Sequence, residues 1–81
     1  MTQFRVLLFA RYAELFGAPD LLVALPDGAR VTDLIAALRT LPGGELLPAV
    51  PFVAVNHEQC DPTRRLMSGD ELALLPPLAG G

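Results

Sequence analysis

Short apolar runs with a period of two alternate along the chain with a segment that has helical spacing. The run at 4–10 is apolar on both faces apart from Arg5, which predicts a central strand. Runs at 21–25, 52–56 and 71–75 predict three more strands, each next to turn-forming residues. The short connection between the first two strands predicts that they form an antiparallel pair.

The clearest helix is predicted over residues 31–41, where leucines recur at helical spacing. Thr32 can cap it, and Asp33 lies in the first turn, where the helix dipole favours a negative charge. The sequence Pro-Gly-Gly at 42–44 stops this helix. A short helix is predicted over 11–17 because its last residue is a glycine suited to a left-handed end.

The predicted order is strand, strand, helix, strand, strand, with a very short strand possible after His57. One main helix packed across a small mixed sheet of four to five strands is an α+β design with two layers. The β-grasp, or ubiquitin-like, roll is the compact arrangement with this order. We therefore expect a β-grasp domain over residues 1–76 and an extended tail over 77–81.

The composition limits which classes of binding partner and which cellular compartment we expect. Hydrophobic residues make up 52% of the 81 residues, which is enough for one core and leaves apolar surface for a partner. The net charge is -3 and lysine is absent, so we expect no nucleic-acid partner. A single cysteine, Cys60, fits a reducing cytosol, and the short apolar run near the N-terminus predicts neither a signal peptide nor a membrane span. We expect a cytoplasmic protein.

The C-terminal stretch is the strongest candidate for chemistry. Two prolines after the last strand hold an extended backbone, and a stiff tail loses less entropy when it threads a partner. An apolar link follows, and then two glycines that can pass a narrow channel. A terminal glycine pair alone is weak evidence, because Gly43-Gly44 is expected in an ordinary loop and termini are often disordered. The residues expected to thread a partner's site are Pro76, Pro77, Leu78, Ala79 and Gly80.

The carboxylate of Gly81 would be the reactive group. Without side-chain bulk beside it, it can attack ATP and form an acyl-adenylate. A sulfur donor could then displace AMP and leave a thiocarboxylate.

Residues 69–81 resemble the C-terminus of the molybdopterin synthase small subunit family, a set of ubiquitin-like sulfur carriers. Residues 5–10, followed by Glu14-Leu15, resemble the opening strand and short helix of that family, and Val55-Asn56 and Leu66 fit its middle. The resemblance implies a β-grasp fold and a sulfur-carrier cycle.

The resemblance also implies partners and a division of labour. An activating enzyme would use ATP to adenylate Gly81, and a sulfur donor enzyme would convert it to the thiocarboxylate. The tail would then enter the large subunit, where sulfur passes to cyclic pyranopterin monophosphate to build molybdopterin. The small subunit would bind no cofactor tightly and would supply no acid or base.

The predicted partner interface is apolar. We expect Phe9 and Leu75 to lie on the open side of the sheet and to contact the partner, with Leu78 in the tail. Packing in the core is the alternative for Phe9 and Leu75. Aromatic residues are frequent in the family where this chain has Leu74-Leu75, and lysines are frequent in it but absent here, so the partner surface differs from the family pattern.

The other polar residues give weaker indications of a functional site. His57, Glu58, Cys60 and Asp61 are close in sequence, but a structural zinc site needs four ligands and no second pair follows, so a hydrated turn is favoured and no metal is expected. Asp70 is expected to shape a turn, and Arg64-Arg65 to be a solvated pair.

Three other functions stay open from the sequence. The same chemistry could serve another acceptor, such as thiamine thiazole or a tRNA base. The chain could be a ubiquitin-like modifier joined through Gly81 to lysines of other proteins. It could also be a plain binding module with an inert tail.

Overall fold

The computed structural model describes residues 1–49 and 51–76. Within these ranges the chain forms five strands, two α-helices and one 3-10 turn. Their bounds are β1 (Thr2–Leu8), α1 (Arg11–Phe16), β2 (Asp20–Leu25), α2 (Val31–Arg39), η1 (Gly44–Leu46), β3 (Phe52–Val55), β4 (Glu58–Gln59) and β5 (Leu72–Leu75). No helix in these ranges is long and apolar enough to cross a bilayer.

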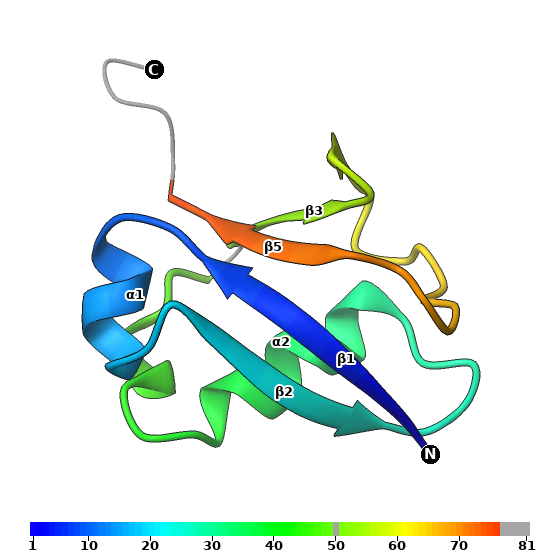
Figure 1. Cartoon of the computed structure of the whole chain (residues 1–81), viewed down its shortest axis with the longest axis horizontal. Coiled ribbons are helices and arrows are strands. Elements are labelled where there is room, and N and C mark those ends of the chain that lie inside the picture. The colour runs from blue at the N-terminus through cyan, green and yellow to red at the C-terminus, as the bar shows by residue number, and fades with distance from the viewer. Residues whose placement is uncertain (50, 77–81) are drawn as a thin grey trace.

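The strands form one mixed sheet in the order β2-β1-β5-β3-β4. The first two strands are antiparallel, as predicted, and β1 pairs with β5 in parallel. β3 pairs antiparallel with both β5 and β4. Figure 1 shows α2 behind the sheet, so the described residues have the predicted α+β architecture with one main helix across one face.

The core lies between the sheet and α2 because apolar side chains alternate along the strands. In β1 the side chains of Phe4, Val6 and Leu8 are buried, and in β5 those of Leu72 and Leu74. These side chains share the helix-facing side of the sheet. On α2 the matching stripe is led by two fully buried leucines, Leu34 and Leu38.

The start of α2 differs from the prediction. The N-cap is Arg30, and Thr32 is already the second helical residue, so the prediction of Thr32 as the cap was wrong. The backbone N–H of Arg30 donates to the carboxylate of Asp33 at 2.8 Å. The Thr32 N–H is bonded to the carbonyl of Pro62 at 3.0 Å, because the 62–64 loop packs against this helix end.

The end of the first strand also differs from the prediction. β1 stops at Leu8, not at residue 10, because the chain leaves the sheet to begin α1. Ala10 has a φ of 50°, and the Phe9 carbonyl accepts a hydrogen bond from the Tyr12 N–H at 3.0 Å. Phe9 therefore lies between the strand and the helix, and Ala10 no longer belongs to the strand pattern.

Gly43-Gly44 is not an ordinary loop. A Cβ on Gly44 would overlap the carbonyl oxygen of Leu38, and one on Gly43 would lie 2.5 Å from the carbonyl oxygen of Leu15. The pair lets the chain pass between the two helices at backbone contact distance. It thereby fixes how the end of α2 is joined to η1.

Gly44→Ala should therefore destabilise the fold strongly. Because the added methyl group meets backbone on α2, we expect a loss of about 3 kcal/mol in the free energy of unfolding. That loss corresponds to a Tm lower by roughly 12–24 °C, measurable by circular dichroism.

Gly17→Ala is the matched control. Gly17 has a φ of 74° but has open space where a Cβ would lie, so the substitution carries only backbone strain. We expect it to cost about 1 kcal/mol. Equal losses for the two variants would contradict the close packing of Gly44.

Candidate functional site

The candidate site begins where β5 ends. β5 lies between β1 and β3, and its parallel pairing with β1 brings its last residue to the end of the sheet where α1 starts (Figure 1). Pro76 is half-buried and is the last residue described. The remaining predicted tail residues, Pro77, Leu78, Ala79, Gly80 and Gly81, lie outside the described residues.

The sheet face opposite α2 is apolar near this exit. Leu7 pairs with Ala73, and Ala73 pairs with Ala54, which makes one row across three strands. Leu75 pairs with Phe52 one row closer to the exit. Leu7, Ala73, Leu75 and Phe52 are each half-buried, although no helix of the described part covers this face.

Phe9 extends the apolar face beyond the strand. It follows Leu8, which pairs with Leu74, so Phe9 and Leu75 come at the same end of their two strands. Phe9 is 46% exposed, which argues against the alternative that it packs in the core. We call Leu7, Phe9, Phe52, Ala73 and Leu75 the tail-side patch.

A polar network holds the other end of β5. The carboxylate of Asp70 accepts hydrogen bonds from the Asn56 amide at 2.9 Å and from the Met67 N–H at 2.8 Å. It also accepts one from Arg64 at 3.2 Å, so Arg64 is a structural ion-pair partner and not the solvated residue that was predicted. The side-chain amide oxygen of Asn56, Oδ1, accepts from the backbone N–H of Glu71 at 3.0 Å. The predicted turn at Asp70 is confirmed.

The charge state of Asp70 follows from these contacts. Partial burial of its carboxyl raises the pKa, but hydrogen bonds from Met67, Asn56 and Arg64, with the Arg64 charge, outweigh burial. The pKa of Asp70 is therefore held below its ordinary value of 3.8. The ionised form stabilises the junction between the β3–β4 turn and β5.

The sequence cluster around His57 does not converge in space. Asn56 and His57 both have positive φ, 54° and 72°, as a tight hairpin turn requires. The His57 ring lies 2.8 Å from Glu71, and Cys60 donates to the Glu58 carbonyl at 3.1 Å. The Asp61 carboxylate accepts from the N–H and hydroxyl of Thr63, and these bonds lower its pKa. Among the described residues, no group of three or more His, Cys, Asp or Glu could hold a metal ion.

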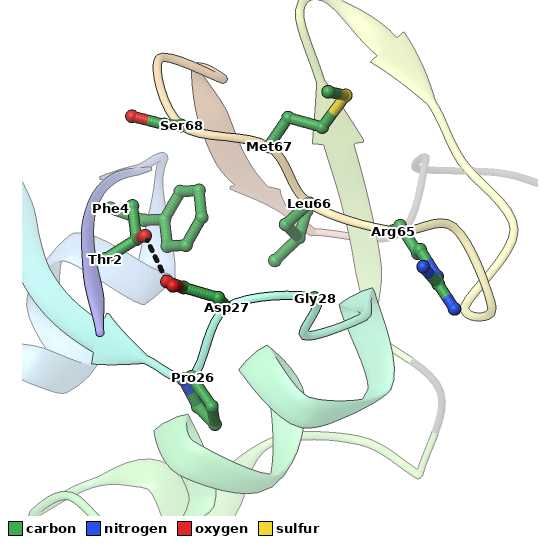
Figure 2. Close-up of a pocket in the computed structure, with 9 residues that line it drawn as sticks. All are labelled: Thr2, Phe4, Pro26, Asp27, Gly28, Arg65, Leu66, Met67 and Ser68. Atoms are coloured by element: carbon green, nitrogen blue, oxygen red, sulfur yellow. Dashed lines mark hydrogen bonds between the residues drawn. The ribbon is translucent and has the colours of Figure 1, made fainter.

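A pocket that the sequence does not predict lies at the opposite end of the sheet. It has a volume of about 450 Å³, and Figure 2 shows it between the start of β1, the loop after β2 and the loop at 65–68. Its walls include Phe4 and Leu66, and the Thr2 hydroxyl donates to Asp27 at 2.9 Å on its rim. Because β5 leaves the sheet at the other end, this pocket is not part of the tail site.

Comparison with known proteins places the tail in a family context. The ThiS family model matches residues 6–81, a range that includes both the tail-side patch and Gly81. The chain belongs to the ThiS family. The match runs through the tail to the last residue, so this ThiS-family chain shares the full C-terminal stretch with the family pattern.

The relatives of this ThiS-family chain agree with that assignment. The "Molybdopterin synthase sulfur carrier subunit" of Arabidopsis thaliana is 35% identical over 80 residues, covering 98% of this chain and 83% of that protein. The protein with the same description in Chlamydomonas reinhardtii is 35% identical over 82 residues, covering 98% and 99%.

Two solved structures confirm the β-grasp fold of this ThiS-family chain. SAMP1 from Haloferax volcanii is 30% identical, with a TM-score of 0.80 over 98% of this chain and 99% of that one. One chain in the complex of subunits 1 and 2 of the molybdopterin-converting factor from Helicobacter pylori is 25% identical. Its TM-score is 0.72, over 99% of this chain and 100% of that one.

Asp70→Asn should lower stability at neutral pH. The variant loses the charge that Arg64 faces, so we expect a cost of about 1–3 kcal/mol at pH 7. Because the folded-state pKa of Asp70 is lowered, its stabilisation exists above pH 4 or so and is lost as pH falls through that pKa. The difference in Tm between variant and wild type should therefore shrink at about pH 2.

Glu45→Gln, a change at an exposed carboxyl of η1, is the control and should leave Tm nearly unchanged at both pH values. A cost for Asp70→Asn that does not depend on pH would show that shape, and not charge, is what the network requires.

Proposed function

We propose that this chain is the sulfur carrier subunit of a molybdopterin synthase, with the carboxylate of Gly81 as the group that bears sulfur. The observation that carries the proposal is the family match through Gly81, together with 35% identity to relatives described as sulfur carrier subunits. The position of β5 adds a physical reason. The strand that leads into the tail is central and is paired on both sides, so it is held firmly.

The chemistry of the cycle belongs to the C-terminus. An oxygen of the Gly81 carboxylate attacks the α-phosphorus of ATP, and pyrophosphate leaves. Sulfur at the sulfide oxidation level, supplied as HS⁻ by the sulfur donor enzyme, then attacks the acyl carbon; the bond from that carbon to the AMP oxygen breaks, AMP leaves, and a thiocarboxylate remains. Its sulfur is transferred to cyclic pyranopterin monophosphate, and water restores the carboxylate. ATP is consumed at the activating enzyme, and this chain holds no cofactor tightly.

The tail-side patch gives the tail a docking surface. Phe9, Leu75 and their neighbours surround the exit, so a partner that covers the patch receives the tail directly. The large subunit of molybdopterin synthase is the proposed partner, and the Helicobacter pylori complex of subunits 1 and 2 supports it. Pro76 and Pro77 would keep the tail extended toward that subunit's active site, and Leu78 and Ala79 would line the channel before Gly80.

The remaining partners follow from the chemistry. An adenylating enzyme must load Gly81, and a sulfur donor enzyme must supply the sulfur. The large subunit must supply the acid and base groups, because the proposed reactive group here is a backbone carboxylate. We place the cycle in the cytosol, where a lone cysteine such as Cys60 stays reduced.

A protein modifier is the second candidate, and one observation favours it. SAMP1 from Haloferax volcanii, which is 30% identical, is described in a related structure as a small archaeal modifier protein. A modifier would form an isopeptide bond between Gly81 and a lysine of another protein. This chain contains no lysine, so it could donate to others but could not form side-chain-linked chains with itself.

The tail-side patch can be tested by truncating two of its members, the exposed Phe9 and the half-buried Leu75. Because Phe9 and Leu75 lie outside the core cluster, alanine at either position should leave Tm nearly unchanged. We expect the affinity for the large subunit to fall roughly tenfold to thirtyfold, as for a buried interface anchor. Isothermal titration calorimetry measures the affinity.

Met67→Ala is the control, since Met67 is 68% exposed but lies in the pocket at the far end of the sheet. It should bind the large subunit as the wild type does. A large loss of Tm with unchanged affinity for Phe9→Ala or Leu75→Ala would favour core packing over docking.

Deletion of Gly81 tests the carrier chemistry. The deletion should leave Tm unchanged and abolish molybdopterin formation in a reconstituted assay, because the acyl group would be misplaced. Intact mass of the wild-type chain, incubated with ATP, activating enzyme and sulfur donor, should show replacement of one oxygen atom by sulfur.

Normal molybdopterin formation by the truncated chain would rule out the proposed cycle. Covalent attachment of the wild-type chain to lysines of other proteins, without sulfur in its intact mass, would favour the modifier function.

A further inference from the structure

β2 is a six-residue edge strand that, within residues 1–49 and 51–76, is paired on one side only. Its partner is β1, in a register that pairs Thr2 with Leu25 and Leu7 with Asp20. Figure 1 shows β2 at the border of the sheet, away from β5 and β3. An edge strand presents a row of backbone N–H and C=O groups that another strand can pair with.

The hydrogen-bond pattern identifies the outward groups of β2. The Leu8 N–H donates to the Pro19 carbonyl at 2.9 Å, which makes this opposed pair a hydrogen-bonded one. Because such pairs alternate along an antiparallel ladder, alternate residues of β2 direct their backbone groups toward β1 or away from it. The residues directed away are Asp20, Leu22 and Ala24. Within the described ranges, no hydrogen bond joins the backbone groups of these three to any loop or side chain.

Asp20, at one end, is the only charged residue of β2, so this edge has little of the usual protection against pairing. Residues 21–25 contain no charge, proline or glycine, and Leu22 is 66% exposed on the open face. The opposite edge is different, because β4 has only two residues and carries Glu58. A short charged edge discourages pairing, whereas a longer apolar edge invites it.

We propose that β2 pairs with β2 of a second copy, antiparallel and about a two-fold axis that passes at Leu22. In this register Leu22 faces its own equivalent, and Asp20 faces Ala24 of the second copy. All three outward residues of each copy then form hydrogen-bonded pairs within the strand bounds. A shift of the axis by one residue in either direction leaves one of them opposite a residue outside β2.

Charge and position are compatible with this pairing. Asp20 faces an alanine and is bridged by Arg5 of its own chain at 2.8 Å, so no carboxylates meet. Pairing at β2 extends the sheet sideways beyond that strand and does not cover the open face of β1, β5 and β3, so the tail-side patch stays accessible on each copy.

The small size of the contact sets its strength. Five paired residues in each strand, 20–24, with one exposed leucine on each side, bury less than the roughly 1,200 Å² typical of stable complexes. The dimer is therefore weak and forms with increasing concentration of the chain. Pairing occurs between free copies and does not depend on the proposed sulfur-carrier function.

Cysteine crosslinking tests the register. In a Cys60→Ser background, Leu22→Cys places two thiols across the axis, where opposed Cα atoms are about 5.5 Å apart and a disulfide can form. Ala24→Cys in the same background is the matched control. Its Cα atoms would be about 14 Å apart, four residues out of register, which is too far for a disulfide.

We expect at least roughly tenfold more crosslinked dimer for Leu22→Cys than for Ala24→Cys in the same redox buffer at high protein concentration. Equal crosslinking of the two variants, or none for Leu22→Cys, would overturn the proposed pairing.

A second measurement needs no oxidation. Sedimentation equilibrium of the wild-type chain should show a dimer whose fraction rises with concentration. Leu22→Lys and Leu22→Glu should each be monomeric, because like charges would face each other at the axis. An equimolar mixture of the two variants should recover the dimer. Circular dichroism confirms that each variant is folded. A wild-type chain that is monomeric up to about 1 mM, the weak end of protein association, or a mixture that stays monomeric, would refute the proposal.

Discussion

The parallel pairing of β1 with β5 is the constraint on which the rest of the structure depends. It places the last strand in the middle of the sheet, between β1 and β3, although the two paired strands are far apart in sequence. A parallel pair needs a long crossover connection, and here α2 crosses the sheet within it. Because both neighbours of β5 hold it by backbone hydrogen bonds, the point at which the chain leaves the sheet is fixed. The apolar residues around that point are then fixed as well.

The start of β5 is held by side chains in addition to its pairing with β1 and β3. Asp70 joins the β3–β4 turn, the 64–67 loop and the strand through three donors. Its charge is compensated by Arg64 and its hydrogen-bonding capacity is used, so partial burial is tolerated. Strand pairing thus holds the whole of this four-residue strand, and the polar network is added just before its start. The polar end positions the strand along its axis, while the exit end is left with apolar neighbours.

The sequence predicted what local pattern controls. Alternation gave the strands, leucine spacing gave α2, and Gly17 ends α1 with a φ of 74°, as expected. It could not give the features that depend on distant segments. The cap of α2 was misassigned because the 62–64 loop occupies the helix start, and the need for Gly44 arises only from its contact with the Leu38 carbonyl. Neither contact produces a periodic pattern in the sequence.

In the candidate site, too, the sequence predicted the features that depend on local pattern and missed those that depend on distant segments. The apolar second face of the first strand indicated that something other than the helix would meet it, and Phe9 is indeed exposed beside the exit of β5. The register that sets Leu7, Ala73 and Ala54 in one row was not predictable, because it depends on pairing between strands far apart in the chain.

A domain of this size has more apolar residues than one core can bury, and the sheet distributes the excess by position. The helix-facing side takes Phe4 with buried leucines and valines, and the open face near the exit takes Phe9 and Leu75 at intermediate or high exposure. Leu22 remains on the open face at the β2 edge, where no strand of the described residues covers it. Since the exit and the β2 edge lie on different sides of β1, contacts at one need not displace contacts at the other. A small carrier can therefore bind a partner through its tail end while its free edge stays available.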